Sequence, residues 1–317
     1  MENTIYEVVI VGAGPAGLTA AIYTSRRALK TLVISKDIGG QLSLTDDVEN
    51  YPGFETIGGL ELSQKFQQQA SKTGAEFLFE GVENISQTAD GFLVNTSSNK
   101  NIKAKAIILA FGLTPRTLDI PGEKELTGRG VTYCATCDGP LYRGKEVVVV
   151  GGGNAALDAA EYMSKIAKKV YMLLRGDAFR GEQVLIDQVK SAENVEIIFG
   201  GVGKEIKGTN KVEAFVYQTK DGQEHTITID GIFIEIGHVA KSDWLNSLGL
   251  NLTDKGEVMI NKDNETNIKG IFSAGDITEI SYKQAVISAG EGCKAALQAY
   301  RYLQGGKPLT PDWTPKK

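Results

Sequence analysis

The same local pattern occurs twice in this chain: an apolar run, a glycine-rich turn, a helix-like segment and a second apolar run. The first copy has its apolar run at residues 6–11 and its turn at 12–17; the second has them at 146–150 and 151–156. Such a unit builds a parallel sheet covered by helices. The repeat therefore predicts an α/β protein with two similar domains, and 317 residues with 42% hydrophobic content are enough for two cores.

The first turn reads Gly12-x-Gly14-x-x-Gly17. Glycines permit a tight turn and close backbone approach, and the following helix start offers N–H groups and a positive dipole end to a pyrophosphate. A nucleotide site is the functional interpretation, and a merely structural turn is the alternative. An acid at the end of the second strand would bind a ribose, but here either Ser35 or Asp37 would serve, or the segment is an exposed polar loop.

The second turn reads Gly151-x-Gly153-x-x-Ala156, with alanine in its last place. Alanine still permits close packing of helix on sheet. Arg175 and Arg180 follow the next strand and would pair with the 2'-phosphate of NADPH by charge-assisted bonds. The alternative is that both arginines belong to a solvated loop.

The remaining segments complete two α/β domains, the second inserted into the first. Residues 76–105 alternate as in an antiparallel element, 107–109 form a buried strand, and the segment after residue 246 is too short for its own core. We place the first, split domain at 1–116 and 242–317 and the inserted domain at 117–241, joined near 112–117 and 237–242. Further predicted elements are strands at 195–199, 212–219, 226–229, 231–236 and 270–274 and a helix at 284–303.

Cys134 and Cys137, with Asp138 directly after them, lie just ahead of the second turn. A dithiol holds two electrons, and a second cysteine is needed to resolve a mixed disulfide. Zinc is the alternative, and it would need two more ligands. The other residues that offer such ligands are Cys293, His225 and His238, for which structural roles are expected.

Charge and composition argue against several kinds of partner. The formal charge of −5 gives no basic surface for nucleic acid and no polybasic membrane anchor. No apolar segment approaches the roughly 20 residues that span a bilayer. Residues 1–4 lead straight into the first strand without a signal-peptide pattern, so a cytoplasmic protein is expected.

Several motifs occur together and in order, and together they closely resemble the low-molecular-weight thioredoxin reductases over nearly the whole chain. They are residues 12–17, Gly39-Gly40-Gln41-Leu42, 48–53, 134–139, 151–156, Ala274-Gly275-Asp276 and Lys283-Gln284-Ala285. The resemblance implies two Rossmann-like three-layer domains, with FAD in the split domain and NADPH in the inserted one. It also implies thioredoxin or a thioredoxin-like partner and a homodimer.

By the family pattern, a hydride passes from the nicotinamide to the flavin, then an electron pair passes to the Cys134–Cys137 disulfide and on to thioredoxin. Cys137 would face the flavin, Cys134 would attack the substrate disulfide, and Asp138 would balance protons. The positions implied for FAD are Gly12, Gly14, Pro15, Ala16, Gly17, Ser35, Gly40, Gln41, Leu42, Asn50, Val82, Gly112, Gly275, Asp276, Lys283, Gln284 and Ala285. Those implied for the pyridine nucleotide are Gly151, Gly153, Asn154, Ala155, Ala156, Arg175 and Arg180.

The chain departs from the family at the NADPH segment, which typically reads His-Arg-Arg with a later arginine. Here it reads Leu174-Arg175-Gly176 with Arg180, so NADH stays possible. The C-terminal part also resembles the flavoprotein subunit of alkyl hydroperoxide reductase. Rival interpretations are a flavin reductase with another donor, such as ferredoxin, or another disulfide carrier, and a non-catalytic nucleotide-binding sensor. The family also implies that the inserted domain rotates about its two connections.

Overall fold

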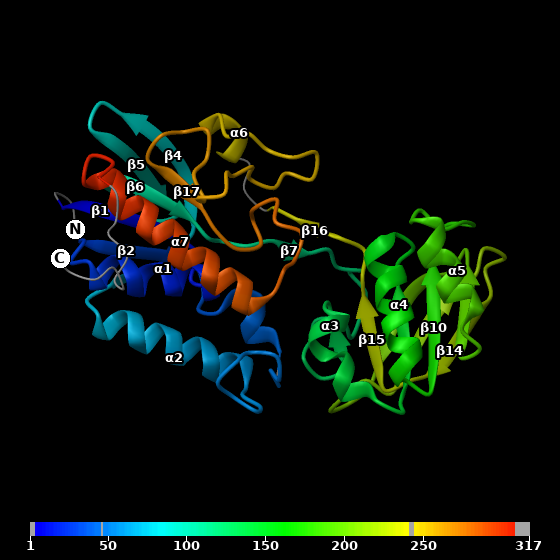
Figure 1. The fold of residues 1–317 in the computed structure, drawn as a ribbon. Helices are drawn as coiled ribbons and strands as arrows, with labels where there is room; N and C mark the ends of the chain where they lie inside the picture. Colours follow the sequence, from blue (N-terminus) through cyan, green and yellow to red (C-terminus); the bar gives the residue numbers. More distant parts are fainter. Residues whose placement is uncertain (1–3, 46, 241–243, 308–317) are drawn as a thin grey trace, which may run out of the picture. The chain divides into compact units, whose positions relative to one another are not determined.

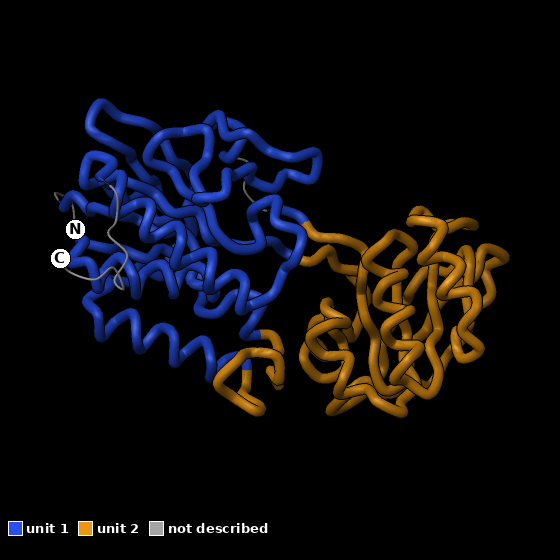
Figure 2. Tube along the Cα trace, in the orientation of Figure 1, with its two compact units in different colours: residues 1–43, 59–114, 239–317 blue, residues 44–58, 115–238 orange. Residues whose placement is uncertain are grey.

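The computed structural model describes residues 4–45, 47–240 and 244–307, and the chain divides into two compact units (Figure 2). Unit 1 comprises Met1–Ser43, Gly59–Thr114 and Val239–Lys317; unit 2 comprises Leu44–Gly58 and Pro115–His238. Two short strands where the chain passes between the units, β7 (Thr114–Pro115) and β16 (His238–Val239), pair with each other. Residues 44–58, which are expected in the first domain, belong to unit 2, and the expected boundary at 241 and 242 lies outside the described residues.

Unit 1 is built on a seven-stranded sheet of order β3-β2-β1-β6-β5-β4, in which β17 also pairs with β6. β5 runs antiparallel to β6 as far as Ala104, and β17 runs parallel to it from Ile107 to Leu109. The C-terminal segment thus supplies a strand beside the middle of the first sheet. The elements are β1 (Ile5–Val11), α1 (Pro15–Arg26), β2 (Thr31–Ser35), the 3-10 helix η1 (Gly40–Leu44), α2 (Gly59–Lys72), β3 (Glu76–Phe79), β4 (Val82–Thr88), β5 (Gly91–Thr96), β6 (Asn101–Leu109), α6 (Trp244–Leu248), β17 (Ile271–Ser273) and α7 (Ala285–Leu303).

Alternation along β1 divides the core of unit 1 between the two faces of its sheet. Val8 and Ile10 are buried in one cluster with alanines of α1 and α7, while Val9 and Val11 are buried in a second cluster with residues of β4 to β6 and α6. α1 and α7 lie side by side (Figure 1), and the small residues at their contact permit this close packing. Unit 1 is therefore layered.

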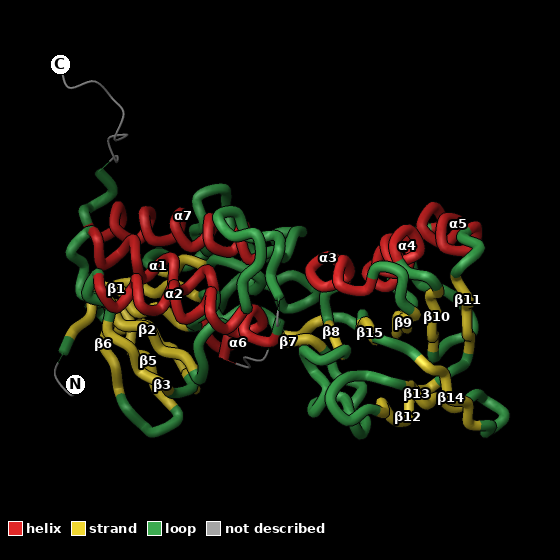
Figure 3. The backbone as a smooth tube through the Cα atoms, turned by 90° about the horizontal axis from the view of Figure 1, so that it is seen from below, coloured by secondary structure: helices red, strands yellow, loops and turns green. Residues whose placement is uncertain are grey.

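Unit 2 contains a five-stranded parallel sheet of order β11-β10-β9-β15-β8 and an antiparallel sheet of order β12-β13-β14. Figure 3 shows α3, α4 and α5 on one side of the parallel strands and β12 to β14 on the other. The elements are β8 (Val131–Thr132), α3 (Ala135–Asp138), the 3-10 helix η2 (Gly139–Tyr142), β9 (Glu146–Val150), α4 (Asn154–Ile166), β10 (Lys169–Leu174), α5 (Gln183–Ser191), β11 (Val195–Phe199), β12 (Val202–Lys207), β13 (Ala214–Gln218), β14 (Glu224–Thr228) and β15 (Gly231–Ile234).

The predicted α/β class with two Rossmann-like units is confirmed. In unit 2, Val147 and Val149 face the helices, and Val148 and Val150 face the antiparallel sheet. One detail was wrong: β3 was expected to be antiparallel but pairs parallel with β2. The alternation that predicted an antiparallel element lies in residues 82–105, whereas β3 itself reads Glu-Phe-Leu-Phe and lies at the open edge of the sheet.

Candidate functional site

The first glycine turn is shaped by close backbone contacts. Gly12 has φ +107°, and a Cβ atom there would lie 2.4 Å from the carbonyl oxygen of Ala110. A Cβ atom at Gly17 would lie 1.9 Å from the carbonyl oxygen of Gly12. Gly14 is the N-cap of α1 and Pro15 follows it, with no side-chain cap in the described part of the chain. The first N–H groups of α1 are therefore available to an anion such as a pyrophosphate.

Other candidate residues of unit 1 lie at the carboxyl ends of its parallel strands, where α/β sheets bind ligands. Ser35 is the last residue of β2, and Gly275 and Asp276 follow β17. The Ser288 hydroxyl donates to the Asp276 carboxylate at 3.0 Å, and the Gln41 amide donates to the carbonyl of Leu113 at 2.8 Å. These groups fit a flavin nucleotide, because a glycine cradle and a carboxylate lie at one sheet edge.

The other residues predicted for FAD are spread over unit 1 and residues 44–58. Lys283 donates to the carbonyl of Thr278 and pairs with Glu257 at 3.1 Å, so protein groups hold its ammonium. Gly40 and Leu42 lie in η1, Asn50 is exposed between η1 and α2, Val82 begins β4, Gly112 follows β6, and Gln284 and Ala285 are the N-cap and first residue of α7. Pro15, Ala16 and Gly17 form the first turn of α1.

The second glycine turn makes the same kind of close backbone contacts, with different neighbouring residues. Gly151 has φ +147°, and a Cβ atom there would lie 2.4 Å from the carbonyl oxygen of Glu235. Ala156 is buried, and Gly153 is the N-cap of α4 with open space around an added Cβ atom among the described residues. Asn154 and Ala155 begin α4, whose first N–H groups are likewise available to a phosphate.

A loop after β10 folds back over this turn. The Arg180 N–H donates to the carbonyl of Gly152 at 2.7 Å, while Asn154 and Glu182 exchange two hydrogen bonds at 2.8 and 3.2 Å. Arg175 and Arg180 are both exposed. The acid Glu182, two residues after Arg180, was not singled out from the sequence. Exposed guanidinium groups next to a phosphate-binding turn fit a pyridine nucleotide.

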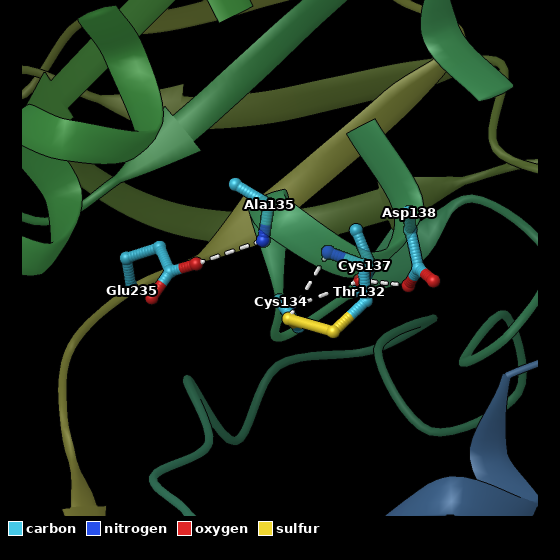
Figure 4. The surroundings of a disulfide bond; sticks show 6 residues. All are labelled: Thr132, Cys134, Ala135, Cys137, Asp138 and Glu235. Atoms are coloured by element: carbon cyan, nitrogen blue, oxygen red, sulfur yellow. Dashed lines mark hydrogen bonds between the residues drawn. A yellow bond between two sulfur atoms is a disulfide. The ribbon is translucent and has the colours of Figure 1, made fainter. Parts of the chain in front are cut away.

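Cys134 and Cys137 form a disulfide with their Cα atoms 5.3 Å apart (Figure 4). Cys134 is the N-cap of the short helix α3, and its sulfur accepts the Cys137 N–H at 3.2 Å. Both residues are half-buried. The turn of α3 brings the two cysteines together, and exposed Thr136 between them leaves the pair open at the surface of unit 2.

Asp138 is connected to Cys134 through Thr132. The Thr132 hydroxyl donates to the Asp138 carboxylate and accepts the Cys134 N–H at 3.2 Å. Thr132, which the sequence analysis did not single out, therefore orients the acid relative to the sulfur pair. A half-buried carboxylic acid one residue from Cys137 can exchange protons with a thiol.

Glu123 supports the loop that precedes Cys134. Its buried carboxylate accepts the N–H groups of Leu118 and Asp119 and the Tyr133 hydroxyl at 3.0 Å. Burial, with the charge of Glu123, raises the pKa of Tyr133 to about 12. Tyr133 therefore stays protonated as a donor, and its role is to hold the loop.

Glu235 is a further acid beside the disulfide, and the sequence analysis missed it. Its carboxylate accepts the Ala135 N–H at 3.2 Å at the start of α3 (Figure 4). Burial raises the pKa of Glu235 to about 7; the charge of Asp158 adds to this, and the Ala135 N–H acts against it. The signal was present: residues 231–236 form an apolar run in which Glu235 is the single charged residue.

The alternative zinc ligands lie in separate elements. Cys293 is a free, half-buried cysteine of α7, and burial raises the pKa of its thiol. His225 stacks on Tyr217 in the antiparallel sheet, and His238 begins β16. The described ranges contain no group of three His, Cys, Asp or Glu side chains placed to hold a metal ion. Nor does any helix within them have the length and apolar character to cross a membrane.

Comparison with known proteins gives consistent matches. Residues 6–292 match the family described as pyridine nucleotide-disulphide oxidoreductase. The chain is 43% identical to the thioredoxin reductase of Bacillus subtilis over 96% of both chains. Its structure is similar to thioredoxin reductases from Streptococcus pyogenes (TM-score 0.90, 35% identity, 96% and 99% coverage) and Giardia duodenalis (TM-score 0.89, 40% identity, 95% and 100% coverage).

Proposed function

This chain belongs to the pyridine nucleotide-disulphide oxidoreductase family, and from that premise we propose that it is a thioredoxin reductase. Family membership entails the use of a flavin and a pyridine nucleotide. The observation that carries the proposal is the Cys134–Cys137 disulfide on α3, in the unit that also holds the second glycine turn. The named relatives align with this chain over almost their entire length.

The start of α1 would hold FAD and the start of α4 would hold NAD(P)H, and together these groups would supply an electron pair to the disulfide. The electron pair breaks the Cys134–Cys137 bond, and two protons complete two thiols. Cys134 then loses its proton and attacks a thioredoxin sulfur, giving a mixed disulfide and one thioredoxin thiol. Cys137 attacks Cys134, which restores the internal disulfide and releases the second thiol. Asp138, oriented by Thr132, receives and returns a proton in these steps.

We propose FAD as the flavin of unit 1. The uncapped start of α1 would hold the pyrophosphate, and Asp276, which accepts from Ser288, would bond the ribityl chain. Ser35 at the end of β2, or Asp37 after it, would bind the adenosine ribose. The other residues of the predicted set would contribute backbone and ring contacts.

NADPH is the proposed donor, with Arg175 and Arg180 binding its 2'-phosphate. Glu182 beside Asn154 reduces the positive charge near this loop, so the preference over NADH should be moderate. Arg175→Ala and Arg180→Ala should each raise KM for NADPH about three- to tenfold and leave KM for NADH unchanged. Arg129→Ala, an exposed arginine of the same unit, is the control. Equal changes for both nucleotides would contradict the assignment.

The main test is reduction of a thioredoxin by the flavin-loaded protein with NADPH and with NADH. Cys134→Ser should keep reduction of the flavin by the nucleotide and lose thioredoxin turnover by a factor of about 1,000 or more, because the attacking thiolate is gone. Cys293→Ser should turn over at the wild-type rate. Retained turnover in Cys134→Ser, or a wild type without turnover, would overturn the proposal.

From the family resemblance we also propose a homodimer, and from the lack of a signal-peptide pattern in the sequence we propose a cytoplasmic location. Sedimentation of the flavin-loaded protein should give about twice the mass of one 317-residue chain. A single-chain mass at working concentration would contradict the dimer.

A further inference from the structure

Glu235 and Asp138 lie on opposite sides of the disulfide (Figure 4). Asp138 reaches Thr132 on one side, and Glu235 reaches the Ala135 N–H on the other. The proposed reaction uses Asp138 and leaves Glu235 without a role. A partly buried carboxyl group that serves no reaction step has a desolvation cost, and its presence beside the sulfurs calls for a physical reason.

The backbone fixes Glu235 in this place. Its N–H continues the pairing of β15 with β9 by donating to the carbonyl of Val150 at 2.9 Å, and its own carbonyl oxygen faces Gly151. Since β9, β15 and the glycine turn belong to the core of unit 2, the backbone of Glu235 is held next to the start of α3. The hydrogen bond from the Ala135 N–H then holds its side chain there.

Two N–H groups in the first turn of α3 donate to the sulfur and to the carboxyl group. The Cys137 N–H donates to the Cys134 sulfur and the Ala135 N–H donates to Glu235. A thiolate at Cys134 and a carboxylate at Glu235 would both lie at the start of α3, and two like charges in the same neighbourhood repel each other. Only one of the two is stabilised without cost.

We propose that Glu235 is a positioning residue of the redox pair, which orients the start of α3 while neutral and opposes the Cys134 thiolate when ionised. This rests on the proposed redox role of the cysteines. The groups that act on Glu235 are the Ala135 N–H at the start of α3 and the Asp158 carboxylate of α4, which adds a negative charge. Burial and the Asp158 charge favour the neutral carboxyl group.

The raised pKa of Glu235, about 7, locates the effect near neutral pH. Below that pH the carboxyl group is neutral and the thiolate forms unopposed; above it, the carboxylate raises the pKa of the Cys134 thiol. Linkage works in both directions. After an electron pair breaks the S–S bond and before the second proton completes the second thiol, the remaining thiolate raises the proton affinity of an ionised Glu235.

The test measures the alkylation rate of Cys134 by iodoacetamide against pH, in flavin-loaded protein carrying Cys137→Ser and Cys293→Ser. With Glu235 intact, the rate should rise over a broad range with two inflections. Glu235→Gln keeps the acceptor for the Ala135 N–H and removes the charge. It should give a single inflection at lower pH and about a threefold to tenfold higher rate just above neutrality, which corresponds to a shift of half to one pKa unit.

Matched variants separate charge from structure. Glu196→Gln, an exposed acid of β11, should reproduce the curve with two inflections. If Glu235→Gln also gave two inflections, the proposed effect of the Glu235 charge on the Cys134 thiolate would be overturned. This would hold even if Glu235→Ala changed the alkylation rate through the lost hydrogen bond. Thioredoxin turnover by the unmodified protein tests the proposed function separately, so an inactive wild type with a normal Glu235 effect would refute only the proposed function.

Discussion

The two glycine turns have the same backbone frame and differ in one neighbouring side chain. In unit 1 the N–H of Ala110 donates to Val11, and its carbonyl oxygen lies 2.4 Å from an added Cβ atom at Gly12. In unit 2 Glu235 makes the same two contacts, with Val150 and Gly151. The strand that closes each turn is therefore equivalent. One copy presents a methyl group, and the other presents a carboxyl group to the disulfide.

The turns also differ in their third small residue. An added Cβ atom at Gly17 would lie 1.9 Å from a main-chain oxygen, whereas Ala156 carries its Cβ atom without such a collision. A shared phosphate-binding frame thus tolerates different side chains in the two copies. The glycine motif therefore determines the class of ligand, and the side chains of the neighbouring strands determine the additional function of each copy.

The largest expected effect comes from making the first turn like the second. Gly17→Ala forces a methyl group against the carbonyl oxygen of Gly12, and the backbone there can move only at a high cost. We therefore expect the free energy of unfolding to fall by about 3 kcal/mol or more and the protein to lose its flavin. The reverse change, Ala156→Gly, should cost only about 1 kcal/mol for the lower helix propensity. Flavin absorbance after gel filtration and thermal unfolding measure both. Normal flavin content in Gly17→Ala would show that the turns are interchangeable.

A smaller effect on stability is expected where α7 packs on the first glycine turn. Among the described residues, no equivalent helix contact is given for the second glycine turn. A Cβ atom at Gly292 would lie 2.0 Å from the carbonyl oxygen of Ala16. Gly292→Ala should therefore separate α7 from α1 at a cost of about 1–3 kcal/mol. Gly290→Ala is the matched control on the same helix, since no described atom lies within 4 Å of an added Cβ atom there. It should stabilise the helix by about 0.5–1 kcal/mol in thermal unfolding.

Sequence alone predicted the features that depend on local pattern. Both turns, the strands that precede them and the α/β class follow from glycine spacing and apolar runs, which act over a few residues. α2 was missed because its sequence is rich in glutamine and carries few of the apolar residues that mark a buried helix face. β12 was missed because its alternation is interrupted by Gly203 and a bulge.

The neighbourhood of the disulfide could not be predicted so fully. Cys134, Cys137 and Asp138 are adjacent in sequence, and their association is visible there. Glu235 reaches Ala135 across 100 residues, and only the order of strands in the parallel sheet brings β15 beside α3. A single acid in an apolar strand marks an unusual position, yet its partner depends on tertiary structure.

The smallest expected effect concerns stability at the position where the two turns differ. The folded pKa of Glu235, about 7, lies above its ordinary 4.5, so between these values the folded state binds more protons than the unfolded state. The free energy of unfolding should therefore fall from about pH 4.5 to about pH 7 and level off above, by on the order of 1 kcal/mol after screening of this partly exposed group. Glu235→Gln, and Glu235→Ala, which recreates the residue of the first turn, should lack this fall. Urea unfolding of flavin-loaded protein at pH 5.5 and pH 8 measures the difference between wild type and variant. A constant difference would mean that Glu235 is ionised across this range, so that its pKa is not raised and the two turns differ by a full charge at both pH values.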